Sequence, residues 1–237
     1  MPHIQIGTIE LLLNRKPIKN LHISVLPPDG RVRVSAPEKM TDTAIRMAVI
    51  SRIPWIKKQQ SDFAKQPRQS DREMRNGESH YLWGRHHRLS VVERAGRHEV
   101  KVGRGKIDLY VSAGTSIENK DLLLSQYYRS ALKSRVSELL PYWEKEISVT
   151  ANSWGVKKMK TKWGSCNTEA RRIWLNLELA KKPPECLEYI LVHELVHLLE
   201  RRHNERFKAY MDKHLPDWRE RRSLLNKMPL AHNNWIY

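Results

Sequence analysis

The stretch His193-Glu194-Leu195-Val196-His197, followed by His203, is the most informative part of the chain. On a helix, residues four positions apart lie on the same face, so His193 and His197 can direct imidazole nitrogens at one metal ion. Glu194 is one step round the helix, where its carboxylate can act as a general base without becoming a ligand. Three protein ligands leave one coordination position open, as is typical of a catalytic zinc.

The residues around this motif predict a buried helix. Apolar side chains between Cys186 and Leu199 gather opposite the two histidines. A polar His-Glu-His face on such a helix would carry a large desolvation cost without a metal. The sequence therefore favours a zinc site over a pair of hydrogen-bonded helix histidines.

We predict His203 as the third ligand. Its spacing from His197 equals that of the last two histidines in the metzincin pattern His-Glu-x-x-His-x-x-Gly-x-x-His, although Glu200 occupies the glycine position and no methionine turn is evident. The alternatives are two carboxylates further along, Glu205 and Glu220, either of which would give a site with two histidines and one glutamate.

The first part of the chain, residues 1–115, predicts a β-rich region with one helix. Alternating apolar residues on either side of Pro27-Pro28-Asp29-Gly30 indicate a hairpin. Thr41 is predicted to cap a helix that Pro54 kinks, and the polar stretch 65–79 to form a linker or loop. Further strands are expected at 81–83, 87–92, 99–102 and 107–111.

Residues 116–237 are predicted to form the catalytic domain. An apolar stripe after Ser116 indicates a long helix that Pro141 interrupts, and Gly155 is predicted to end the next segment in a left-handed cap. Alternation over 173–179 indicates a strand, which we expect at a sheet edge, where it could align an extended peptide. Asn204 is well placed to cap the helix after His203.

Several motifs occur in a characteristic order along the chain. They are Ala36-Pro37, Trp55-Ile56 and Tyr81-Leu82-Trp83-Gly84 in the first half, followed by Trp163-Gly164-Ser165-Cys166, residues 173–179, the His-Glu-Leu-Val-His stretch, His203, Phe207 and Leu215-Pro216-Asp217-Trp218. With these motifs the chain resembles the YgjP-like metallopeptidases, bacterial zincins related to the SprT and WLM groups. The resemblance implies an α+β fold, with a small β-rich N-terminal unit followed by a zincin-like metallopeptidase domain. It also implies one zinc ion held by His193, His197 and His203, with Glu194 as the base.

These observations predict a zinc-dependent peptidase acting on proteins or peptides. Zinc would activate a water molecule, and Glu194 would take its proton and pass one to the leaving amine. Candidates for stabilising the oxyanion are Tyr210, His214 and Tyr237. Two alternatives stay open: a nucleic-acid-binding module with a regulatory or vestigial zinc site, and zinc-dependent hydrolysis of a non-peptide amide.

The composition is that of a globular protein, and we expect it to be cytoplasmic. No run of eighteen apolar residues and no signal peptide is evident, so neither a membrane span nor export is predicted. The two cysteines, Cys166 and Cys186, suit reduced thiols better than a disulfide framework. For Cys166, a small buried side chain is favoured over a reactive thiol. The sequence does not indicate an oligomeric state.

Lysine and arginine outnumber aspartate and glutamate by 43 to 26, which gives a formal net charge of +17. Such an excess favours attraction to nucleic acid or another polyanion. We therefore expect weak binding of DNA or RNA without sequence preference, with an affinity that falls steeply as salt rises. The alternative is a highly charged surface with no defined partner. The basic residues near the catalytic motifs are Lys157, Lys158, Lys160, Lys162, Arg171, Arg172, Lys181, Lys182, Arg201, Arg202 and Arg206.

Overall fold

The structure is a computed structural model that describes residues 3–26, 30–65, 72–159 and 162–227. These residues form two compact units, of which the first ends at residue 65 and the second begins at residue 72. The linker predicted between residues 65 and 79 falls partly on residues outside the described ones. Both units combine helices with sheets, so the fold is α+β as predicted.

The first unit is a four-stranded sheet with two helices. The sheet order is β1-β2-β4-β3, in which β2 and β4 are parallel and the outer pairs are antiparallel. The predicted hairpin is confirmed as β3 and β4, although its residues 27–29 lie outside the described ones. Thr41 caps the first helix by accepting from the Ala44 amide, and a new helix begins around Pro54. The elements are β1 (His3–Ile6), β2 (Ile9–Lys16), β3 (His22–Leu26), β4 (Arg31–Pro37), α1 (Asp42–Ile50) and α2 (Ile53–Lys65).

The second unit begins with a sheet of the same topology. Its order is β5-β6-β8-β7, again with a central parallel pair and antiparallel outer pairs. The two sheets thus repeat one arrangement that no internal sequence repeat had indicated. The four strands, β5 (Ser79–Leu82), β6 (Arg85–Glu93), β7 (Glu99–Gly103) and β8 (Lys106–Val111), confirm the strands predicted from the sequence.

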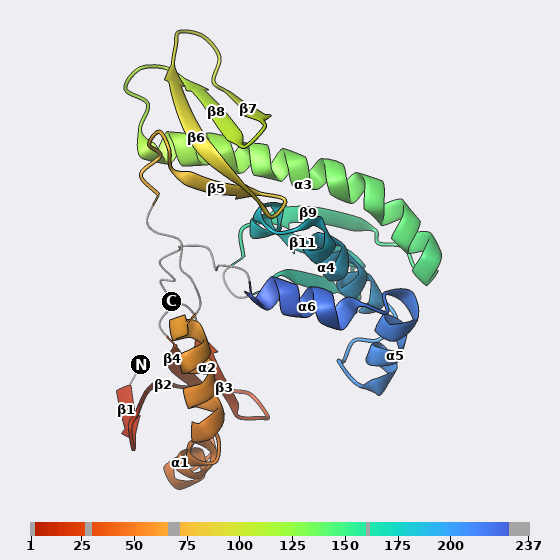
Figure 1. Cartoon of the computed structure of the whole chain (residues 1–237). Helices are drawn as coiled ribbons and strands as arrows, with labels where there is room; N and C mark the ends of the chain where they lie inside the picture. The colour runs from red at the N-terminus through yellow and green to blue at the C-terminus, as the bar shows by residue number, and fades with distance from the viewer. Residues whose placement is uncertain (1–2, 27–29, 66–71, 160–161, 228–237) are drawn as a thin grey trace. The chain divides into compact units, whose positions relative to one another are not determined.

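A long helix, α3 (Ile117–Ile147), lies between this sheet and the remaining elements of the second unit (Figure 1). A three-stranded sheet follows, with the order β10-β11-β9. The other elements of the unit are β9 (Ser153–Lys157), β10 (Gly164–Asn167), β11 (Arg172–Asn176), the 3-10 helix η1 (Leu177–Lys181), α4 (Pro184–Val196), α5 (Glu205–His214) and α6 (Trp218–Lys227).

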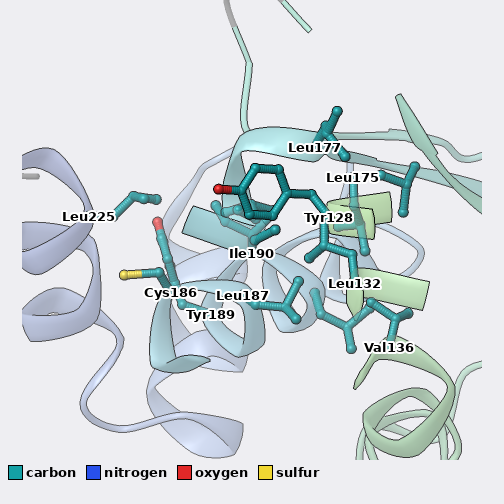
Figure 2. Packing of buried hydrophobic residues seen from close by; sticks show 14 of the residues in the cluster. Tyr128, Leu132, Val136, Leu175, Leu177, Cys186, Leu187, Tyr189, Ile190 and Leu225 are labelled. Carbon is teal, nitrogen blue, oxygen red and sulfur yellow. The ribbon is translucent and has the colours of Figure 1, made fainter. Parts of the chain in front are cut away.

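The core of the second unit surrounds α4. Leu132 of α3 and Leu187 of α4 are fully buried, and Figure 2 shows them on the α3 side of the α4 helix. On another side of α4, Cys186 lies near Leu225 of α6. Because α4 is packed on several sides, its position is fixed before any ligand binds.

Two predictions about helix ends are wrong. Pro141 lies inside α3, which continues because Trp143 and Ile147 beyond it are buried. Pro141 itself is exposed, so water can reach the helix carbonyl that is left without a partner by the missing N–H of the proline. The left-handed cap is Ser148, with φ of 58° and ψ of 44°. Gly155 instead lies in β9 opposite Trp174, where a Cβ atom would be 2.5 Å from the Trp174 ring.

The described residues of the two compact units are separated between residues 65 and 72, whereas the sequence placed a boundary between 115 and 116. The strands between Ser79 and Val111 share one core with α3 and α4 because Leu89, Ile107 and Leu109 are buried in it. That residues 116–237 alone form the catalytic domain stays a prediction. Within the described parts of the chain, every helix is too short or too polar to cross a membrane. The cytoplasmic location stays a prediction.

Candidate metal centre

The helix α4 carries the first two histidines of the site. It begins at Pro184, where proline is favoured because the first helical amides need no partner within the helix. The hairpin turn between β5 and β6 holds the chain just before it: the Trp83 amide donates to the Ala180 carbonyl at 2.8 Å. Gly84 packs so closely on Pro183 that a Cβ atom would meet its ring at 2.8 Å. The position of α4 therefore depends on the sheet that precedes α3.

The third histidine returns to the helix through a short connection. The turn is held by the Arg202 amide, which donates to Glu200 Oε1 at 3.0 Å. Asn204 then caps α5 by accepting from the Phe207 amide at 3.0 Å, as the sequence predicted. These contacts place His203 beside His193, with their Nε2 atoms 2.9 Å apart.

Three imidazoles converge in this way. One ligand atom from each of His193, His197 and His203 lies within 4.8 Å of the other two. The ring of Phe207 packs against all three, with centroid distances of 4.8 to 4.9 Å. This role of Phe207 could not be predicted from the sequence, because an apolar residue at the start of a helix carries no signal of its own.

The ring nitrogens of His193, His197 and His203, called the triad below, are suited to bind a cation. The Nδ1 atom of His197 lies 3.1 Å from the Glu200 carbonyl oxygen, and an Nδ1 proton donated there would leave Nε2 as a free lone pair. Burial, and then the neighbouring His197 and His203, lower the pKa of His193 to about 3. Burial also lowers the pKa values of His197 and His203. Neutral imidazoles that face one another are the form in which histidine binds metal. The three residues therefore fit a zinc ion.

Glu194 lies next to the triad and is almost fully buried, with 5% of its surface exposed. Burial raises the pKa of its carboxyl to about 8, and the charge of Lys162 opposes that rise. A cation bound at the triad would lower this pKa, because an opposite charge stabilises the carboxylate. Glu194 therefore has the exchangeable proton that a general acid and base requires.

Gly164, at the start of β10, makes room for this carboxylate. A Cβ atom at Gly164 would be 2.4 Å from Glu194 Oε1 and 2.8 Å from its Cγ. No L-residue with a side chain fits there unless Glu194 moves. The sequence motif containing Gly164 was noticed, but its contact with Glu194 joins residues thirty positions apart and could not be inferred from spacing.

We expect Gly164→Ala to lower peptidase activity about 100-fold, because a displacement of about 1 Å at a reacting group has that cost. Metal content should stay unchanged, since the three atoms nearest to the added Cβ all belong to Glu194 and none to a histidine. Metal analysis and turnover measured on one preparation check both parts. Gly103→Ala is the matched control, because a Cβ atom there meets nothing within 4 Å. Equal activity in Gly164→Ala and the wild type would contradict the assigned contact.

A cleft of about 1000 Å³ opens over the centre. One wall is formed by residues 162–169, which include β10, and the other walls are formed by α4, α5 and α6. In the three-stranded sheet β10 is an edge strand and β11 is the central one. The strand at 173–179 expected at an edge is therefore central, and its last residues form η1. Two-sided pairing of β11 leaves β10 and β9 as the edge strands, and of these two β10 is the one whose residues line the cleft.

Other candidate residues lie away from the triad. Glu205 pairs with Lys208, and Glu220 is exposed on α6; neither joins the cluster of possible metal ligands among the described residues. Tyr210 accepts from Arg206 at 3.3 Å, and neither Tyr210 nor His214 is among the residues that line the cleft. Tyr237 lies outside the described residues.

Cys166 lines the cleft from β10, and Cys186 is buried in the core; both are free thiols. Burial, and then the charge of Glu194, raise the pKa of Cys166 to about 11. A thiol with so high a pKa carries little thiolate at neutral pH, which disfavours a reactive role.

The arrangement agrees with what comparisons with known proteins find. The model of the YgjP-like metallopeptidase domain matches residues 19–228, which is most of the chain. The chain belongs to this family. The YgjP-like match includes His193, Glu194, His197 and His203, and it begins within the first compact unit. This match to a metallopeptidase family confirms the family predicted from the motifs.

Among solved structures, one similar to this YgjP-like chain is the crystal structure of the metallopeptidase zymogen of Pyrococcus abyssi abylysin. The two share 18% sequence identity with a TM-score of 0.34, over 40% of this chain and 98% of that one. A search of the curated proteins finds no match.

Proposed function

We propose that this YgjP-like protein is a zinc-dependent peptidase that binds one ion through His193, His197 and His203. The observation that carries the proposal is the convergence of these three imidazoles beside a buried carboxylate, Glu194. Metallopeptidases need a metal with an open position, and a set of three histidines provides it. When bound, zinc supplies Lewis-acid chemistry, polarising a substrate carbonyl and making water more acidic.

Glu194 is the proton carrier in this mechanism. Its carboxylate takes a proton from the attacking water and then gives a proton to the nitrogen of the leaving amine. The burial that raises its pKa limits its contact with bulk water and favours return of the proton to the substrate. Gly164 accommodates the carboxylate because it has no side chain that would collide with it.

The free edge of β10 is the surface along which we propose that the substrate lies. An extended segment can add to such an edge through main-chain hydrogen bonds, which select for backbone conformation more than for side chains. The strand also carries Gly164, so a peptide aligned on it would pass close to Glu194. Unfolded segments of proteins would be suitable substrates because folded ones do not present extended backbone.

Metal removal tests the proposal. We expect purified full-length protein to cleave an unfolded protein such as reduced casein, to lose that activity on treatment with a chelator, and to regain it with one equivalent of zinc. The core packs α4 without the metal, so circular dichroism should show a folded protein throughout. Full activity in protein shown by elemental analysis to be metal-free would contradict the proposal, as would the absence of cleavage by protein fully loaded with zinc.

A further inference from the structure

The cleft over the metal centre is rich in positive charge. Four basic side chains line it, and the only carboxylates that line it are Glu169 and the buried Glu194, all among the described residues. The basic residues come from four segments: Lys162 precedes β10, Arg201 follows α4, Lys208 lies on α5 and Arg222 lies on α6. Positive charge therefore surrounds the triad instead of marking one side of it.

Most of this charge is not neutralised by the protein. Lys208 pairs with Glu205, but among residues that the structure describes, Lys162, Arg201 and Arg222 form no ion pair with a carboxylate. The neighbouring Arg221 differs, since it pairs with both Glu188 and Asp217. Adjacent arginines on α6 thus serve different purposes: Arg221 ties the helix to α4, and Arg222 lines the cleft.

The charges also act on the reacting groups. The positive charge of Arg222 reaches His193 and His203, and that of Lys162 reaches Glu194 and His197. These two cations lie on different segments, so an extended chain in the cleft would have a cation on each of two walls. Unpaired charges in a concave site focus their field on whatever binds there.

The aromatic residues that line the cleft favour a peptide over a nucleic acid. Single-stranded nucleic acids bind by stacking bases on exposed aromatic rings. Here Tyr189, Phe207 and Trp218 are buried, with at most 8% of their surface exposed. Trp163 also lines the cleft and is half-buried, with the Lys182 ammonium 5.5 Å from its ring centroid. Phe207 packs on the histidines, and Tyr189 stacks on Trp218. The cleft thus offers cations and a strand edge, but few free ring faces.

We propose that the preferred substrates of this site are acidic peptide segments, with aspartate or glutamate side chains flanking the cleaved bond. The inference rests on the proposed peptidase function and adds the substrate class to it. The edge of β10 would hold the backbone, and Lys162, Arg201 and Arg222 would pair with the acidic side chains. The same charges would repel lysine-rich and arginine-rich segments.

The test compares three labelled peptides that are identical except for flanking glutamate, glutamine or lysine residues. Their binding to full-length Glu194→Gln protein is measured by fluorescence anisotropy. Exposed ion pairs are individually weak, so two or three of them predict about tenfold tighter binding of the glutamate peptide than of the glutamine peptide at low salt. The difference should shrink at high salt, because mobile ions screen the cleft.

Two charge reversals localise the effect. Arg222→Glu should abolish most of the preference, and the double variant Arg222→Glu with Lys162→Glu should reverse it. Lys213→Glu is the matched control: it makes the same change in net charge at an exposed position on α5 that does not line the cleft. The control should keep the preference. Equal binding of the three peptides, or an equal loss in Lys213→Glu, would overturn the proposal.

The remaining outcomes separate this inference from the proposed function. Preferential binding of the acidic peptide with no cleavage by zinc-loaded wild-type protein would uphold the inference and contradict the peptidase. Cleavage of all three peptides with the same kcat/KM and the same affinity would support the peptidase function and contradict the preference for acidic segments. A single-stranded oligonucleotide that depends on Arg222 for binding, while no peptide does, would overturn the inference in favour of nucleic acid.

Discussion

Replacing Glu194 by glutamine is expected to lower peptidase turnover by about 100- to 10,000-fold while zinc stays bound with unchanged stoichiometry. General acid–base catalysis contributes a factor of this size, and glutamine keeps the shape of the side chain without its exchangeable proton. The substitution suits the buried site, because an uncharged amide costs less to bury than an ionised carboxylate. Elemental analysis and a peptidase assay on one preparation measure both quantities.

The matched control is Glu200→Gln. Glu200 is a half-buried glutamate in the turn after α4; glutamine keeps the Oε1 atom that accepts from the Arg202 amide, and the backbone carbonyl that faces His197 Nδ1 is unaffected by a change of side chain. The control should keep its activity within a few fold. Loss of stoichiometric zinc in a folded Glu194→Gln protein would place Glu194 among the ligands and contradict its assignment as the base.

Replacing His203 by alanine is expected to weaken zinc binding by at least about 100-fold. The change removes one of three donors, whereas even residues that only support ligands alter metal affinity 10- to 100-fold. It also removes the Nε2 atom that lies 2.9 Å from that of His193. Competition with a chromophoric chelator would measure the affinity directly.

The rival ligands supply the comparison for His203. Glu205→Ala and Glu220→Ala should bind zinc as the wild type does, because both side chains are exposed and lie outside the cluster of imidazoles. A third comparison, His214→Ala, removes a histidine that does not line the cleft. If either glutamate variant lost zinc while His203→Ala kept it, the site would have two histidines and one glutamate.

The parts of the fold governed by local sequence were predictable. The caps predicted at Thr41 and Asn204 follow from side-chain chemistry within three residues, and both are confirmed. Ser116, where the helical pattern was seen to begin, caps α3 in the same way. The end of α3 was not predictable in the same way. The local rule places a break at Pro141, but burial of Trp143 and Ile147 further along keeps the helix intact.

The candidate site also has parts that local sequence predicts and parts that it does not. The spacing of the histidines within eleven residues was enough to propose that they converge, because one helix and one turn connect them. The contact of Gly164 with Glu194 and the position of Arg222 beside the triad depend on how β10 and α6 pack against α4. Only the tertiary structure brings those segments together. The composition gives the size of the positive charge, but only the structure shows that part of this charge lies around the cleft.

X-ray absorption at the zinc edge, measured on purified full-length protein, tests the central claim most directly. We predict one zinc per chain with three imidazole nitrogens at about 2.0–2.1 Å and no sulfur neighbour. His203→Ala should lose one of these nitrogens or the metal itself. A spectrum with sulfur at about 2.3 Å, as thiolate ligation by Cys166 would give, or stoichiometric zinc in a variant lacking both His193 and His197, would contradict the account.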